Sequence, residues 1–133
     1  MSTIAEASAA IHSDMRRTAA RPIDMMHLAK QALGDAALEV EILRTFSERI
    51  ARHLSGLETA TSVPDMLHHL HTLKAASVGV GAWSLAEHAH IMNEELVLGT
   101  PLDPELIEDI RMAVAEVQAF IAQRVADADA ADF

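Results

Sequence analysis

The stretch TSVPDMLHHLHTLKAASVGVG, residues 61–81, has the pattern of one helix with its start and stop signals. Ser62 can cap the helix, and Asp65 stands three residues later, at the spacing of a capping box. We expect Gly79 and Gly81 to end it, because glycine readily takes the conformation that closes a helix. Residues at steps of three and four form the face that we expect to pack on a core: Met66, Leu70, Leu73 and Ser77.

Similar signals outline the rest of the chain. Capping residues, glycines and apolar spacing predict four more helices, over residues 25–33, 36–60, 82–98 and 104–126. Their connections are short, and short links between long amphipathic helices imply antiparallel neighbours. We therefore predict an all-α protein, an up-and-down antiparallel four-helix bundle with an additional short N-terminal helix or helices.

The length of 133 residues points to a single domain. Residues 1–20 are rich in alanine and weakly patterned, so we treat them as a variable N-terminal segment with helical potential. The bundle is expected over residues 21–127, followed by an acidic tail over residues 128–133.

The charge excludes several classes of function. The chain has 20 acidic and 10 basic residues, a formal charge of −10, which repels phosphate backbones and anionic membranes. It has no cysteine, and no apolar run approaches the roughly 18 residues that a membrane span requires. Glu6 interrupts the N-terminus before an apolar core of a secretion signal can form. We expect a cytoplasmic monomer that binds neither nucleic acid nor membrane.

One histidine of the quoted helix does not face the core. At about 100° per residue, His71 lies about 100 to 160° away from the core-facing residues. Lys74 lies about 60° to one side of it and Ala75 about 40° to the other, while Leu67 and Val78 are almost in line with it. The sequence thus predicts an accessible imidazole at the margin of the core, with an ammonium group beside it.

These neighbours suggest phosphoryl chemistry. Neutral imidazole is a competent nucleophile near neutral pH, since its ordinary pKa is about 6.5. The Lys74 ammonium group can sit against phosphoryl oxygens on His71. The missing bulk at Ala75, Ala76 and Gly79 would let the surface of another protein approach closely.

The stretch HTLKAASVGVG, residues 71–81, resembles the signature of histidine phosphotransfer (HPt) domains, the helical bundles of multistep two-component phosphorelays. His71, Lys74 and Gly81 match the family pattern, while Ala75 replaces a glycine. The family often has a glutamine 22 residues after the histidine, where this chain has Asn93. The similarity extends over about residues 22–125.

The resemblance implies that His71 accepts a phosphoryl group from the aspartate of one receiver domain and passes it to another. It implies that Lys74 stabilises the phosphoryl charge and that Asn93 hydrogen-bonds to His71. The expected partners are receiver domains of response regulators and hybrid histidine kinases, with Mg²⁺ in the receiver and no cofactor in this chain. No P-loop-type phosphate loop is present, so we expect a phosphocarrier without kinase or ATPase activity of its own.

We expect the partner to contact an apron of residues around the histidine. It comprises Leu67, His68, Leu70, Ala75, Val78 and Gly81. Such an apron suits a modest, transient interface.

Two other functions remain open at this point. One is a helical adaptor that binds receiver or kinase domains without phosphotransfer. The other is a metal-binding bundle built on His68, His71, His88 and His90, although adjacent helical positions diverge too far for all of them to converge.

Overall fold

The computed structural model describes residues 21–131 of the chain. Over this range it contains five helices and no strand: α2 (Met25–Gln31), α3 (Ala36–Thr59), α4 (Val63–Val80), α5 (Trp83–Val97) and α6 (Pro104–Ala131). The prediction of an all-α protein is confirmed. The N-terminal segment expected over residues 1–20 lies outside the described residues.

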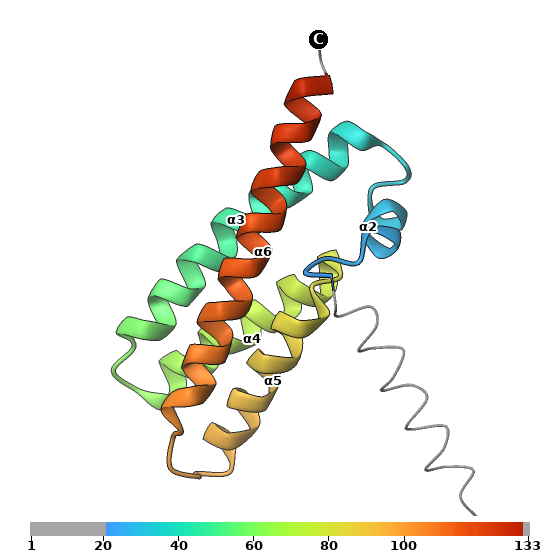
Figure 1. Cartoon of the computed structure of the whole chain (residues 1–133). Helices are drawn as coiled ribbons and strands as arrows, with labels where there is room; N and C mark the ends of the chain where they lie inside the picture. The colour runs from blue at the N-terminus through green and yellow to red at the C-terminus, as the bar shows by residue number, and fades with distance from the viewer. Residues whose placement is uncertain (1–20, 132–133) are drawn as a thin grey trace, which may run out of the picture.

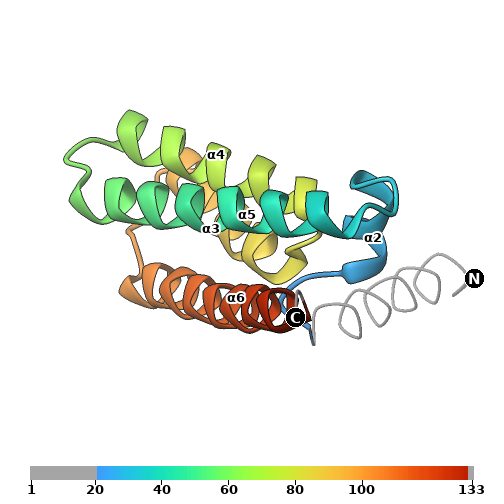
Figure 2. The ribbon, with the colours of Figure 1, turned by 90° about the horizontal axis from the view of Figure 1, so that it is seen from above.

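The four long helices form a bundle (Figures 1 and 2). α3 packs against α4 and α6, and α5 packs against the same two helices from the other side. Each long helix therefore has two long neighbours, as in an up-and-down bundle. The short helix α2 contacts α3 and α4, at the end of the bundle where α4 is followed by α5 (Figure 1).

The predicted capping residues begin the helices as expected. The Asp24 carboxylate accepts hydrogen bonds from the backbone N–H groups of Met26 and His27, and Asp35 caps α3 in the same way. The Ser62 hydroxyl accepts from the backbone N–H of Asp65 at the start of α4. Each cap satisfies donors that the first helical turn leaves without partners.

A single glycine ends α4. Gly81 has a left-handed φ of 85°, and the backbone N–H of Ala82 donates to the carbonyl of Ser77 at 2.8 Å. The backbone N–H of Gly81 donates to Val78 at 3.3 Å, which completes the pattern of a Schellman motif. Gly79 lies inside the helix, so its predicted role as a terminator is wrong; a helix tolerates an internal glycine at a cost of about 1 kcal/mol.

The last helix is longer than predicted. α6 continues to Ala131, beyond the expected end near Ala126 and through four of the residues that we assigned to an acidic tail. Alanine favours the helical state, and the side chain of Gln123 bonds to Asp127 one turn later at 2.9 Å. Arg44 of α3 also pairs with Asp129 at 3.4 Å. Local propensity and these contacts explain the extension.

The core is built mainly from aliphatic side chains of all four long helices. From α4 it takes Leu70, Leu73, Ser77 and Val80, and helical periodicity placed the first three of these there. Met66, the fourth predicted member, is only partly buried. No helix within residues 21–131 has the length and apolar character needed to cross a membrane.

Candidate functional site

His71 lies on the outer face of α4. Its side chain is exposed, while Leu70 and Leu73 on the same helix are fully or almost fully buried. Within residues 21–131, His71 forms no side-chain hydrogen bond. The expected position at the margin of the core is confirmed, and the ring is accessible to a large reactant.

Lys74, one turn after His71, reaches across to the neighbouring helix. Its ammonium nitrogen Nζ lies 2.9 Å from Nδ1 of His90 on α5. The other ring nitrogen of His90, Nε2, lies 3.0 Å from Oε1 of Glu94. An ammonium group only donates, so Nδ1 of His90 accepts from Lys74, and Nε2–H donates to Glu94. These contacts hold the half-buried Lys74 against α5, one helical turn after His71.

Asn93 does not form the predicted hydrogen bond. α4 and α5 are antiparallel, so the contact between Lys74 and His90 puts His71 and Asn93, one turn away on each helix, at about the same level of the bundle. Asn93 is partly buried in this position. No hydrogen bond joins it to His71 in the part of the chain that the structure describes. The two residues therefore lie at the same level on neighbouring helices without a hydrogen bond between them.

Four residues of the predicted apron around His71 are accessible to solvent, as contact with a partner would require. His68, Ala75 and Val78 are exposed, and Leu67 is partly exposed. Leu70 is fully buried and Gly81 is buried against α2, because the first faces the core and the second closes the helix. Neither can touch a partner in this conformation, so these two assignments are wrong.

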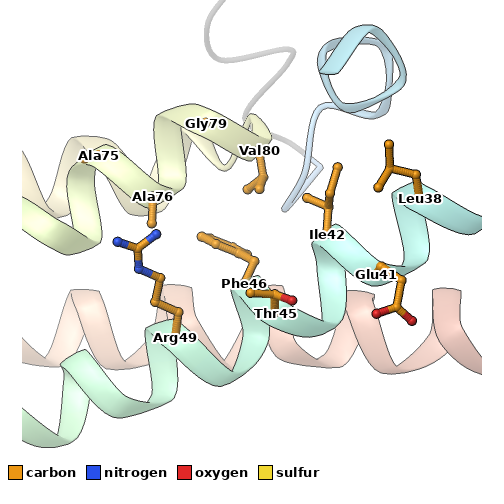
Figure 3. A pocket seen from close by; sticks show the side chains of 10 residues that line it. All are labelled: Leu38, Glu41, Ile42, Thr45, Phe46, Arg49, Ala75, Ala76, Gly79 and Val80. Carbon is orange, nitrogen blue, oxygen red and sulfur yellow. The ribbon is translucent and has the colours of Figure 1, made fainter. Parts of the chain in front are cut away.

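A groove lies beside the apron, between α3 and α4 (Figure 3). Its volume is about 520 Å³. One wall consists of the small residues Ala75, Ala76 and Gly79, and Phe46 and Arg49 extend from α3 on the other side (Figure 3). The small side chains predicted on this part of α4 thus border a hollow.

A set of contacts fastens the C-terminal end of α4 to α2. The backbone N–H of Asp24 donates to the carbonyl of Gly81 at 2.9 Å, and its carboxylate accepts from Nε1 of Trp83 at 3.1 Å. Nε2 of His27 donates to the carbonyl of Gly79 at 3.2 Å, and the His27 ring stands edge-on to Trp83. We call Asp24, His27, Gly81 and Trp83 the α2 clamp. It fixes the helix that carries His71.

The pKa of Asp24 reflects this clamp. Burial by itself would raise the pKa of this carboxyl group. Hydrogen bonds from Trp83 and from the backbone of His27 and Met26, with the nearby charge of His27, outweigh burial and hold the pKa below its ordinary value. The carboxylate form is thus part of the clamp.

The histidines do not gather as the metal-binding alternative requires. His68 lies against His53 and His69 on one side of the bundle, whereas His90 is bonded to Lys74. Within residues 21–131 no group of three or more histidine or carboxylate side chains is arranged to hold a metal ion.

Sequence reasoning missed several residues around the site. His90 and Glu94 stand beside Lys74, and Trp83 and His27 complete the α2 clamp. His90 follows Lys74 by 16 residues. The antiparallel register of the two helices was the signal that would have paired them.

One comparison with known proteins gives a match, and it agrees with this geometry. The family model described as "Hpt domain" matches residues 41–120, more than half of the chain, and the match contains His71, Lys74 and Asn93. No curated protein and no solved structure matches the chain. Hpt domains serve in histidine phosphotransfer within two-component signalling, as phosphocarriers that interact with receiver and kinase domains. The extent of the match, on a helical bundle with an exposed histidine, shows that this chain belongs to the Hpt domain family.

Proposed function

We propose that this protein relays a phosphoryl group between receiver-domain aspartates through His71, in a multistep two-component phosphorelay. The observation that carries the proposal is the exposed His71 ring on α4, with the Lys74 ammonium group one turn further along. Receiver domains of response regulators and hybrid histidine kinases are the partners, and Mg²⁺ belongs to the receiver. We expect the carrier to act as a cytoplasmic monomer.

The reaction needs little from this chain beyond position and charge. The ring nitrogen of His71 that holds the free electron pair attacks the phosphorus of an aspartyl phosphate. A P–N bond forms while the P–O bond to the receiver aspartate breaks, and the aspartate leaves as a carboxylate with the electron pair. The reverse sequence of steps, on a second receiver, transfers the group onward.

Lys74 can stabilise the phosphoryl oxygens without leaving its present partner. A lysine ammonium group has three donors, and the contact with Nδ1 of His90 uses one of them. A second donor can then face a phosphoryl group on His71. His90 and Glu94 would fix the position of the ammonium group in advance. Because its position is already fixed, Lys74 loses less conformational entropy when it pairs with a phosphoryl group on His71.

The exposed apron and the groove support a receiver as the partner. Leu67, His68, Ala75 and Val78 offer a mixed apolar and polar surface around His71. The adjoining groove, with Ala75 on its edge, leaves room for side chains of the partner. A small apolar patch with polar neighbours suits a transient complex.

The decisive experiment is incubation of the full chain with a radiolabelled phospho-receiver, followed by acid treatment. We expect the wild type to acquire a label that acid removes, because a phosphoramidate hydrolyses in acid. We expect His71→Gln to acquire none, while the control His88→Gln, which changes a partly buried histidine on α5, is labelled normally. Labelling of His71→Gln would contradict the proposal. ATP without a kinase should label none of these proteins.

The same experiment separates the relay from the adaptor alternative. An adaptor would bind the phospho-receiver, and the wild-type chain would remain unlabelled. In that case the proposal of phosphotransfer would be wrong, although the interaction with receivers would stand.

The role of Lys74 has its own test. We expect Lys74→Ala to slow transfer in both directions by about tenfold or more, because a hydrogen bond to a charged group contributes about 1.5–3 kcal/mol. Lys30→Ala, which removes an exposed lysine of α2, is the control and should transfer at the wild-type rate. Unchanged rates for Lys74→Ala in single-turnover measurements would remove this lysine from the mechanism.

A further inference from the structure

Three histidine rings meet on the side of the bundle where α3 and α4 pack together. His53 belongs to α3, and His68 and His69 belong to α4. Nδ1 of His53 lies 3.0 Å from Nδ1 of His69, and the two ring centroids are 5.3 Å apart. The His68 ring lies 6.2 Å from His53 and 5.3 Å from His69. Neither the phosphotransfer chemistry nor the core requires this cluster.

The contact between His53 and His69 is built into the packing of the two helices. The His69 ring lies on the backbone of α3 at Gly56, where a Cβ atom would be only 2.3 Å from its Cε1 and 2.5 Å from its Nε2. Any side chain at this position would push the ring away. A glycine inside a helix lowers the stability of that helix. The structural effect of Gly56 within α3 is therefore to make room for the His69 ring.

The number of protons on the two rings determines whether the contact between His53 and His69 is attractive or repulsive. A hydrogen bond between two Nδ1 atoms needs one N–H group and one free electron pair. When both rings are neutral, one carries its proton on Nδ1 and the other on Nε2. One added proton leaves the bond in place, because a doubly protonated ring can still donate to a neutral one. A second added proton puts N–H groups and positive charges on both sides, and the contact becomes repulsive.

We propose that the His53–His69 contact is an acid-sensitive fastener between α3 and α4, which opens when both rings are protonated and so loosens the first turns of the helix that carries His71. The geometry of the two nitrogens and the space at Gly56 carry this proposal. It does not depend on phosphotransfer.

The charges around the fastener favour its opening in acid. Burial first of all lowers the pKa of His53, and the positive charges of His69, Arg49, His68 and Arg52 lower it further. These groups come from both helices, and no carboxylate within residues 21–131 is among the groups whose charge acts on His53. The folded state therefore binds a proton at His53 less readily than the unfolded state does. The contribution of neutral His53 to the stability of the folded state is complete above the ordinary histidine pKa of about 6.5. It decreases as the pH falls below that value and is fully lost once the pH has passed the lowered pKa of His53 in the folded state.

The fastener lies close enough to the site for its state to matter there. His68 touches both rings, is exposed, and belongs to the apron one turn before His71. Opening of the contact would therefore change the shape and charge of the surface on which a partner is proposed to dock.

Urea unfolding of the full chain, followed by circular dichroism, tests the fastener at about pH 8 and about pH 5.5, on either side of the ordinary histidine pKa. We expect the unfolding equilibrium constant of the wild type to rise several-fold more between these conditions than that of His53→Gln or His69→Gln. The control His88→Gln should behave like the wild type, because His88 lies on α5 outside the cluster. An equal rise in the wild type and both variants would overturn the proposal.

A second measurement uses the wild-type chain alone and does not depend on whether the variants fold. Long-range ¹H–¹⁵N correlation spectra report which nitrogen of each histidine carries the proton. At about pH 8, above the ordinary histidine pKa, we expect one ring of the pair to be protonated at Nδ1 and the other at Nε2. Protonation of both rings at Nε2 would place two free electron pairs face to face, and that result would refute the fastener. Because neither measurement involves phosphate, failure here is distinct from failure of the proposed relay.

Discussion

The C-terminal end of α4 and the outer face around His71 are held very differently. At its C-terminal end, carbonyl groups of Gly79 and Gly81 accept hydrogen bonds from α2, and the Asp24 carboxylate binds Trp83 of α5. Around His71 the outer face is exposed, and within the described range its ring has no hydrogen-bond partner. The difference shows how the fold can serve a reactive side chain. The backbone that positions the nucleophile is fixed at the helix end, while the ring itself stays free to react.

The open face can be tested with a bulky side chain. We expect Ala75→Arg to reduce transfer from a phospho-receiver by about a hundredfold, since small misplacements of reacting groups can cost that much. Circular dichroism should remain that of the wild type, because Ala75 is exposed. Ala115→Arg on the exposed side of α6 is the matched control and should transfer normally. Full activity of Ala75→Arg would mean that partners do not approach this face.

The clamped end can be tested by comparing two capping aspartates. We expect Asp24→Ala to lower the free energy of unfolding by about 2–3 kcal/mol, because it removes both a helix cap and a charge-assisted hydrogen bond to Trp83. Asp35→Ala removes only a cap, so we expect about 1 kcal/mol. Urea unfolding measures both. Equal losses would show that the bond to Trp83 adds nothing to the clamp.

Two glycines of α4 provide the smallest and sharpest contrast. Gly81→Ala should destabilise the protein by about 1–2 kcal/mol, because an L-residue is disfavoured at the positive φ of 85° and its Cβ would lie 3.0 Å from Cβ of Asp24. Gly79→Ala should instead stabilise it by about 0.5–1 kcal/mol, since no atom lies within 4 Å of the added Cβ. Thermal unfolding of the two variants would show shifts of opposite sign. A neutral or stabilising shift for Gly81→Ala would mean that the clamp does not depend on the conformation of Gly81.

Local signals in the sequence were sufficient for most of the fold. Asp24, Asp35 and Ser62 begin their helices through hydrogen bonds within three residues, which makes such caps readable from sequence. The outward direction of His71 also follows from helical periodicity alone. The end of α6 was harder to predict, because a helix that ends in alanine and aspartate residues can either fray or continue. In α6 the ion pair between Asp129 and the distant Arg44 helps to hold the last turn.

The missing parts of the site depend on contacts between helices. The bonds from Lys74 to His90 and from Asp24 to Trp83 join residues 16 and 59 positions apart, and they require the relative register of two helices. The family resemblance implied a hydrogen bond between Asn93 and His71. Such a bond depends on the side-chain rotamers of both residues, which their spacing in the sequence does not determine. Leu70 and Gly81 were misplaced on the apron because proximity along the chain does not guarantee exposure.

The contact between Trp83 and Asp24 also has a practical consequence. The chain has one tryptophan and no tyrosine, so its near-ultraviolet emission comes almost entirely from a single indole. That indole sits where α2, α4 and α5 meet, with its N–H bound to a carboxylate. Undocking of the short helix α2 would therefore change the emission spectrum of the unlabelled protein. The molecule carries its own optical probe of whether the helix behind the reactive histidine is locked.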